Sequence, residues 1–179
     1  MKYFIFSDIH GSETALDNAL NQFYHMGCDY MCILGDVLNY GPRNGLPKGL
    51  NPQAVAEKLN AISDQIIAVR GNCDSEVDQM LLQFPCMNDY AFIVDNGVRL
   101  FLTHGHIYNE TNNLTLKSDV LFYGHTHSWK LEQTNRITVC NTGSITFPKE
   151  DNSPTFAIYE EKSIGIYTLD GFLQKEVKL

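Results

Sequence analysis

Residues 2–10 read KYFIFSDIH, and this stretch decides the fold. Its first six residues form a compact apolar run with aromatic and β-branched side chains, which predicts a buried strand that ends at Ser7. Gly11 and Ser12 follow, and an apolar stripe at helical spacing then runs from Ala15 to Met26. A strand that leads directly into a helix is the first step of a β-α-β unit.

The same alternation continues through the first 70 residues. Residues 30–34 and 65–69 are predicted strands, and Asn51-Pro52 begins a second helix with an asparagine cap and a proline in its first turn. A long loop rich in glycine and proline, residues 35–51, separates the second strand from this helix. This order favours a parallel sheet with helices on its faces.

The second half of the chain is richer in strands. Asn96-Gly97 between two apolar runs is a strong hairpin signal. The predicted strands are 90–95, 98–103, 120–123, 137–141, 155–160, 164–168 and 172–177. Because so much sheet does not fit one open layer, we expect an α/β fold with two packed sheets and outer helices. A chain of 179 residues is about the size of one domain, so we expect 1–179 to be a single domain.

Composition narrows the class of function. The formal net charge of -8 argues against a protein that coats long nucleic acid, because such binding depends on Lys and Arg. No run of about 20 apolar residues predicts a membrane span. The five cysteines are odd in number and form no C-x-x-C pair, so neither a disulfide framework nor a structural zinc site is expected. Together these features indicate a cytoplasmic protein.

Five short polar clusters follow the apolar runs. They are Asp8-Ile9-His10, Gly35-Asp36, Gly71-Asn72, His104-Gly105-His106 and Gly124-His125-Thr126-His127. Because open α/β sheets bind ligands at the carboxyl ends of their strands, we expect these clusters to converge on one edge.

The side chains of these clusters are imidazoles, carboxylates and an amide. Imidazole suits Zn, Fe, Mn or Ni, and oxygen ligands suit harder ions such as Mn. Asp36 lies between two groups of candidate ligands and could bridge two metal ions. Any one cluster alone is common by chance and is more often a capped loop, but no structural demand explains the ordered set of five.

The ordered set resembles the signature of the calcineurin-like metallophosphoesterases, which is D-x-H, G-D, G-N-H-[DE], H-G and G-H-x-H. The match covers residues 8–127. The segments 35–44 and 70–75 resemble the small bacterial YfcE-type phosphodiesterases. The resemblance implies a four-layer α/β/β/α sandwich of two mixed β-sheets flanked by helices.

The resemblance also implies a dinuclear metal site and a chemistry. One divalent ion would take Asp8, His10, His127 and the bridging Asp36, and the other would take Asp36, Asn72, His104 and His125. Mn²⁺ is the expected metal, and Zn²⁺ or Fe fits the same ligands. The expected reaction is hydrolysis of a phosphodiester by a hydroxide that bridges the metals, without a covalent enzyme intermediate.

The chain departs from the family pattern where a leaving-group acid is expected. Cys73 replaces the histidine of G-N-H, Asn39 replaces its orienting aspartate, and Tyr40 replaces a phosphate-binding arginine. We expect esters with good leaving groups to be favoured, with His106 as the nearest other acid. Arg43 and Asn39 are the candidate substrate-binding residues, Arg43 as a phosphate contact, and the alternative for Arg43 is a solvated loop charge. Cys73 is a candidate catalytic residue beside His106, and it could equally be a small residue that fills space.

Three further expectations complete the interpretation. Asp74 is expected to cap a helix that begins near Ser75. The substrate is expected to be a small phosphodiester or nucleotide, and an edge strand near the C-terminus could pair subunits into a homo-oligomer. The alternatives are a phosphatase or nucleotide hydrolase of the same fold, or a non-catalytic protein-interaction scaffold.

Overall fold

The computed structural model describes residues 1–112 and 117–179. Three α-helices and eleven strands are assigned in these residues. The helices are α1 (Glu13–His25), α2 (Pro52–Asn60) and α3 (Glu76–Leu81), with a short 3-10 turn at Ser63–Gln65. The strands are β1 (Lys2–Phe6), β2 (Tyr30–Ile33), β3 (Ile66–Ala68), β4 (Tyr90–Asp95), β5 (Val98–Thr103), β6 (Val120–Tyr123), β7 (Trp129–Gln133), β8 (Thr138–Thr142), β9 (Thr155–Glu160), β10 (Ser163–Thr168) and β11 (Leu173–Lys178).

The first sheet has six strands in the order β11-β10-β9-β1-β2-β3. β1, β2 and β3 are parallel, as the β-α-β-α-β pattern predicts, and β9 pairs with β1 in the antiparallel direction. Ser12 caps α1 by accepting from the backbone N–H of Ala15, and Asn51 caps α2 by accepting from Ala54. The predicted starts of both helices are therefore confirmed.

The second sheet has five strands in the order β4-β5-β6-β8-β7. β5, β6 and β8 are parallel, and the hairpin predicted around Asn96-Gly97 joins β4 to β5. β7 was not predicted from the sequence. It is an edge strand in which Leu131 alone is fully buried, so it lacks the apolar alternation that marks a strand.

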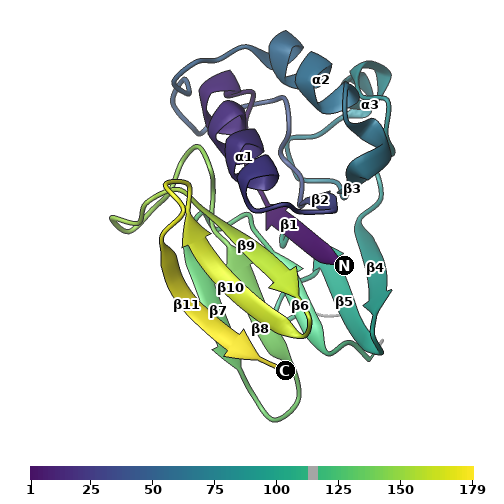
Figure 1. The fold of residues 1–179 in the computed structure, drawn as a ribbon. Helices are drawn as coiled ribbons and strands as arrows, with labels where there is room; N and C mark the ends of the chain where they lie inside the picture. Colours follow the sequence, from purple (N-terminus) through teal and green to yellow (C-terminus); the bar gives the residue numbers. More distant parts are fainter. Residues whose placement is uncertain (113–116) are drawn as a thin grey trace.

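Two apolar cores define the layers. Alternate residues of β1 face opposite sides of the sheet. Phe4 and Phe6 pack against the helices, and Tyr3 and Ile5 pack between the two sheets. Figure 1 shows the three helices gathered together beside β1, β2 and β3. The predicted fold class, two mixed sheets with helices outside, is confirmed.

The outer face of the second sheet carries a smaller apolar cluster. Its buried members are Phe101, Leu121, Tyr123 and Val139, and Tyr108 from the following loop packs against them. In residues 1–112 and 117–179 the helices pack on the first sheet, and Tyr108 is a loop residue that packs on this face.

The topology brings the carboxyl ends of the parallel strands of both sheets to one edge. No helix in residues 1–112 and 117–179 has the length and apolar character needed to cross a membrane.

Candidate metal centre

The seven predicted ligands lie at the ends of β1, β2, β3, β5 and β6. Five of them have positive backbone φ angles between 51° and 65°: Asp8, His10, Asp36, His125 and His127. This conformation is uncommon for residues other than glycine. It is typical of functional sites, where a tight turn directs a side chain into the site. The strand-end turns therefore point these side chains into a common space.

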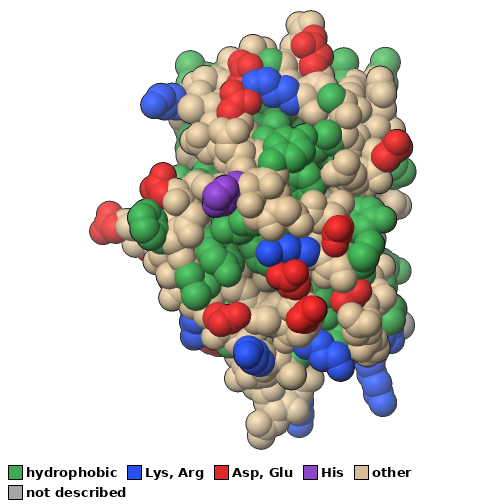
Figure 2. Space-filling model, viewed as in Figure 1, with side chains coloured by type: hydrophobic (Ala, Val, Ile, Leu, Met, Phe, Trp, Pro, Cys, Tyr) green, Lys and Arg blue, Asp and Glu red, His purple; other side chains and the backbone are tan. Residues whose placement is uncertain are grey.

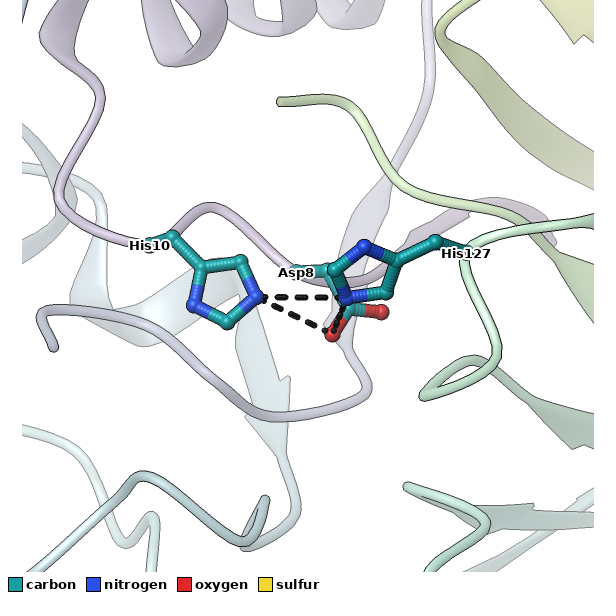
Figure 3. Close-up of side chains that lie close together, drawn as sticks. All are labelled: Asp8, His10 and His127. Atoms are coloured by element: carbon teal, nitrogen blue, oxygen red, sulfur yellow. Dashed lines mark hydrogen bonds and ion pairs between the residues drawn. The ribbon is translucent and has the colours of Figure 1, made fainter. Parts of the chain in front are cut away.

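The first group of ligand atoms surrounds Asp8. Its Oδ1 lies 3.2 Å from His127 Nε2 and 3.5 Å from His10 Nε2, and the two imidazole nitrogens are 3.4 Å apart. Figure 3 shows His127 meeting Asp8 and His10, which both come from the loop after β1. Asp36 Oδ2 lies 3.7 Å from His10 Nε2 and closes the group.

The second group lies on the other side of Asp36. The same Oδ2 atom is 3.6 Å from His104 Nε2. His104 Nε2 is in turn 3.1 Å from Asn72 Oδ1 and 3.2 Å from His125 Nδ1. One carboxylate oxygen thus borders both groups, in the position that a bridging ligand requires.

Backbone carbonyls fix the tautomers of three histidines. The Nδ1 atoms of His10, His104 and His127 lie 2.9, 2.7 and 2.8 Å from the carbonyl oxygens of Asn39, Leu34 and Phe147. A carbonyl can only accept, so each Nδ1 carries the hydrogen and each neutral ring presents the lone pair of Nε2 to the site.

The first group is consequently built from acceptors that face one another. Asp8 Oδ1 is buried and has no hydrogen-bond partner among the described residues. Acceptors do not converge in a protein interior without a positive charge between them. That charge is either a proton on an imidazole or a metal ion, so the donor set of the first group fits a divalent cation.

The second oxygen of each carboxylate is held by the backbone. Asp8 Oδ2 accepts from the N–H of His125 at 3.0 Å, and Asp36 Oδ1 accepts from the N–H of Cys73 at 2.8 Å. These bonds orient the two carboxylates and leave Asp8 Oδ1 and Asp36 Oδ2 for the site. Preorganised ligands of this kind are typical of metal centres.

Asp74 corrects one prediction. Its carboxylate does not cap α3, because Ser75 is the capping residue and the Asp78 carboxylate accepts from the Ser75 N–H and hydroxyl. Asp74 instead accepts from three backbone N–H groups, those of Asp36 and Val37 at 2.8 Å and Gly71 at 2.7 Å. The side chain therefore ties the loop after β2 to the loop after β3.

Two glycines allow the loops to meet this closely. A Cβ on Gly71 would lie 2.1 Å from Asp36 Oδ1, and a Cβ on Gly124 would lie 2.2 Å from Ser7 Oγ and 2.8 Å from Asp8 Oδ2. Any side chain at either position would displace a carboxylate of the site. This explains why glycine precedes Asn72 and His125 in the sequence.

The electrostatics of the first group reflect its pairing. Burial alone would raise the pKa of Asp8, but the contacts with His10 and His127 outweigh it and hold the pKa far below its usual range. Burial alone would lower the pKa of His10, but the Asp8 carboxylate and the Asn39 carbonyl raise it above the ordinary value. In the absence of a metal, His10 therefore holds its second proton to a higher pH than a free imidazole does, and a cation competes with that proton.

Metal affinity is expected to fall with pH through this competition. Because the pKa of His10 is raised, its proton begins to compete with the metal ion at a higher pH than the proton of a free imidazole would. Below that pKa, we expect the Mn²⁺ affinity to drop about tenfold for each pH unit, since one proton is released on binding. Electron paramagnetic resonance of free Mn²⁺ measures this between about pH 5 and about pH 8. A Mn²⁺ affinity that does not change between these two pH values would contradict the assignment of His10 as a ligand.

A cleft of about 690 Å³ opens beside the two groups. Four predicted ligands line it, Asp36, Asn72, His125 and His127, together with the sequence-predicted Asn39, Arg43 and Cys73. Lys149, Thr126 and Asn44 also line it and were not predicted. Asn39 Oδ1 accepts from the Gly41 N–H at 2.9 Å, so its side chain shapes the loop that carries Arg43.

His106 does not line the cleft. Its ring is 5.2 Å from that of His104 and 6.1 Å from that of His125, and it lines a neighbouring hollow of about 420 Å³ that shares His125 with the cleft. Burial and the neighbouring histidines lower the pKa of His106 to about 4. With this pKa the ring is neutral at pH 7, and the N–H of a neutral imidazole is a very weak acid, so the predicted acid role of His106 gains no support from this position.

The fold and the site together define a class of protein. The calcineurin-like phosphoesterase superfamily domain matches residues 1–163, and the chain belongs to this superfamily. The resemblance found in the motifs is thereby confirmed.

Individual relatives are similar over nearly the whole chain. Phosphodiesterase YfcE of Escherichia coli K12 is 46% identical over 171 residues, which cover 95% of this chain and 93% of the relative. The solved structure of the E. coli phosphoesterase YfcE superposes with a TM-score of 0.96 at 44% identity and covers 99% of both chains. Vacuolar protein sorting 29 from Cryptosporidium parvum shares the fold, with a TM-score of 0.69 at 19% identity over 99% of this chain and 98% of that one.

Proposed function

We propose that this chain is a dinuclear metal-dependent phosphodiesterase. The observation that carries the proposal is the single oxygen Asp36 Oδ2, which borders two groups of inward-facing acceptors. Asp8, His10, His127 and Asp36 would hold one ion, and Asp36, Asn72, His104 and His125 would hold the other. The similarity to a relative named as a phosphodiesterase supports a diester substrate. The mix of imidazole and oxygen ligands supports Mn²⁺, while Zn²⁺ and Fe suit the same set.

The residues around the cleft supply binding and orientation. When bound, two divalent ions polarise a phosphate and lower the pKa of a water molecule. The exposed guanidinium of Arg43 and ammonium of Lys149 flank the cleft and suit the anionic oxygens of a phosphodiester. Backbone N–H groups hold the second oxygens of Asp8 and Asp36 and so orient both carboxylates toward the site.

Replacing Cys73 by histidine is expected to change which esters are cleaved well. Burial, with Asp36 nearby, raises the pKa of the Cys73 thiol to about 12, so it is a poor proton donor to a leaving group. A histidine at this position can protonate poor leaving groups, and we expect their rate to rise by about 10²-fold relative to activated aryl diesters. The measurement is kcat for alkyl and nitrophenyl diesters in parallel. An unchanged ratio of the two rates would contradict the idea that the residue at position 73 limits protonation of the leaving group.

Removing the charge of Arg43 is expected to weaken substrate binding. We expect Arg43→Ala to raise KM about tenfold with a smaller change in kcat, because an exposed charge-assisted contact contributes about 1–2 kcal/mol. The matched control is Arg136→Ala, since Arg136 is exposed in the turn between β7 and β8, outside the cleft. Equal KM values for the two variants would return Arg43 to the role of a solvated loop charge.

Two alternatives receive less support. A protein-interaction scaffold has no need for seven converging ligands, and the likeness to vacuolar protein sorting 29 concerns the fold alone. A phosphatase or nucleotide hydrolase would use the same centre, but Tyr40 stands where the phosphatase branch is expected to carry an arginine. We therefore retain a small phosphodiester or nucleotide as the substrate.

The size of the substrate, the cellular location and the oligomeric state of the protein are also proposed. On the face shown in Figure 2, acidic and basic side chains are interspersed, which supports small substrates over long nucleic acid. Five free cysteines support a cytoplasmic location.

An exposed apolar pair at the edge strand β11 supports a homo-oligomer. Phe172 is 70% exposed and Leu173 is 50% exposed. Light scattering that gives the mass of one chain would refute the homo-oligomer.

Hydrolysis of bis-p-nitrophenyl phosphate tests the proposed function. The protein is stripped of metal and refilled with Mn²⁺, and its rate is compared with that of the Asn72→Ala variant. The monoester p-nitrophenyl phosphate is assayed in parallel as a second substrate. We expect diester cleavage that depends on Mn²⁺ and is lost in the variant. A folded protein that turns over neither ester with any divalent metal would favour the scaffold.

A further inference from the structure

The thiol of Cys73 borders the first ligand group on the side of His10 and Asp36. Its Sγ, a ring nitrogen of His10 and a carboxylate oxygen of Asp36 are all within 4.8 Å of one another. Two donors on one tetrahedral zinc ion, bound at about 2.0–2.3 Å each, lie about 3.3–3.8 Å apart. The three donors therefore come onto one cation when the Cys73 side chain turns toward His10 and Asp36.

Local contacts hold the thiol in this place. The backbone N–H of Cys73 donates to Asp36 Oδ1 at 2.8 Å, and Asn72 Nδ2 donates to Sγ at 3.2 Å. The residue is half-buried and lines the cleft, so a cation that enters the site meets it. Cys73 is thus fixed to the carboxylate that both ligand groups share.

A separate observation points to a cation at the same position. Asp8 Oδ1 is buried without a hydrogen-bond partner in residues 1–112 and 117–179, and it lies 3.5 Å from His10 Nε2. Since His10 belongs to this group and to the group that contains Cys73, the thiol borders a place that already demands positive charge.

We propose that Cys73 is a conditional metal ligand: a thiophilic cation such as Cd²⁺ or Zn²⁺ recruits its Sγ beside His10 and Asp36, whereas Mn²⁺ leaves the thiol uncoordinated. The inference rests on the proposed metal centre. Thiolate sulfur prefers soft ions and oxygen ligands prefer hard ones, so one site responds differently to the two classes. On binding, the S–H bond breaks, its proton passes to water, a metal–sulfur bond forms and no oxidation state changes.

The other cysteines provide internal controls. Cys32, Cys86 and Cys140 are buried in the apolar cores, and Cys28 is half-buried beside the helix-side core. None of these four belongs to a candidate metal group in the described residues. A metal–sulfur signal that depends on Cys73 is therefore distinguishable from one that any thiol gives.

The test is a Cd²⁺ titration of the metal-stripped full chain, followed by sulfur-to-cadmium charge-transfer absorption. Wild type, Cys28→Ser and Cys73→Ser are compared, and Mn²⁺ binding is measured for each by electron paramagnetic resonance. We expect a saturating band in wild type and Cys28→Ser that is absent in Cys73→Ser. The Cys73 variant should bind Cd²⁺ about tenfold or more weakly and Mn²⁺ within about twofold of wild type, because the thiolate discriminates by softness.

The outcomes separate this inference from the metal centre itself. A wild-type protein that binds Mn²⁺ but gives no charge-transfer band, or a band that persists in Cys73→Ser, overturns the inference and leaves the metal centre intact. A folded protein that binds neither ion overturns both. Circular dichroism checks the fold of Cys73→Ser, and Cys73→Ala serves as the second variant.

Discussion

Replacing Asp36 by asparagine is expected to reduce metal-dependent diester hydrolysis by roughly 10³-fold or more, because removing one preorganised electrostatic contact already costs about 10²- to 10³-fold. Asp36 Oδ2 lies 3.7 Å from His10 Nε2 and 3.6 Å from His104 Nε2, so its charge serves both ligand groups. Asparagine keeps the shape of the side chain and removes the charge. The loss should therefore appear in metal binding as well as in kcat.

The matched control for this variant is Asp64→Asn. Asp64 is an exposed aspartate before β3, away from the cleft, so its replacement should leave hydrolysis and Mn²⁺ binding near wild type. Isothermal titration with Mn²⁺ and initial rates with bis-p-nitrophenyl phosphate measure both effects. If Asp36→Asn keeps wild-type metal stoichiometry and rate, Asp36 does not bridge two ions.

Replacing Asp74 by alanine is expected to destabilise the fold by about 3 kcal/mol and to disturb the metal centre. The change leaves three buried N–H groups without their acceptor, those of Asp36, Val37 and Gly71, at about 1–3 kcal/mol each. Part of this cost is offset because burial of the Asp74 carboxylate is itself unfavourable, raising its pKa to about 6. The loop that carries Asp36 should then lose its fixed orientation.

Denaturant unfolding of the metal-free protein measures the change in the free energy of unfolding, and Mn²⁺ titration reports the change at the site. Asp78→Ala is the matched comparison, since Asp78 accepts from Ser75 at the start of α3 and not from the metal loops. We expect Asp78→Ala to lower stability without weakening Mn²⁺ binding. Equal losses of Mn²⁺ affinity in the two variants would contradict the role given to Asp74.

The strand-end clusters were predictable because their signals are local. An apolar run followed by Asp8 or His104 marks both the strand and the residue that ends it, and parallel strands carry such ends to one edge. The order of the five clusters then identified the family. Two features of the geometry are not contained in any sequence pattern. One is the position of Asp36 Oδ2 between both ligand groups, and the other is the set of three carbonyl partners that fix the histidine tautomers.

The features that sequence reasoning missed depend on distant partners or weak patterns. Asp74 was assigned to the helix start at the next residue, Ser75, while two of its three donors lie 38 and 37 residues back in the chain. Lys149 enters the cleft through a loop whose path no periodicity specifies. β7 pairs at a sheet edge with polar residues on most of its length, so hydrophobic spacing does not reveal it.

Anomalous X-ray scattering from crystals of the Mn²⁺-loaded protein tests the central claim most directly. The account predicts two peaks of anomalous density, one beside Asp8, His10 and His127 and the other beside Asn72, His104 and His125, with Asp36 between them. A single peak, or two peaks that do not share Asp36, would contradict the dinuclear centre proposed from the acceptor geometry.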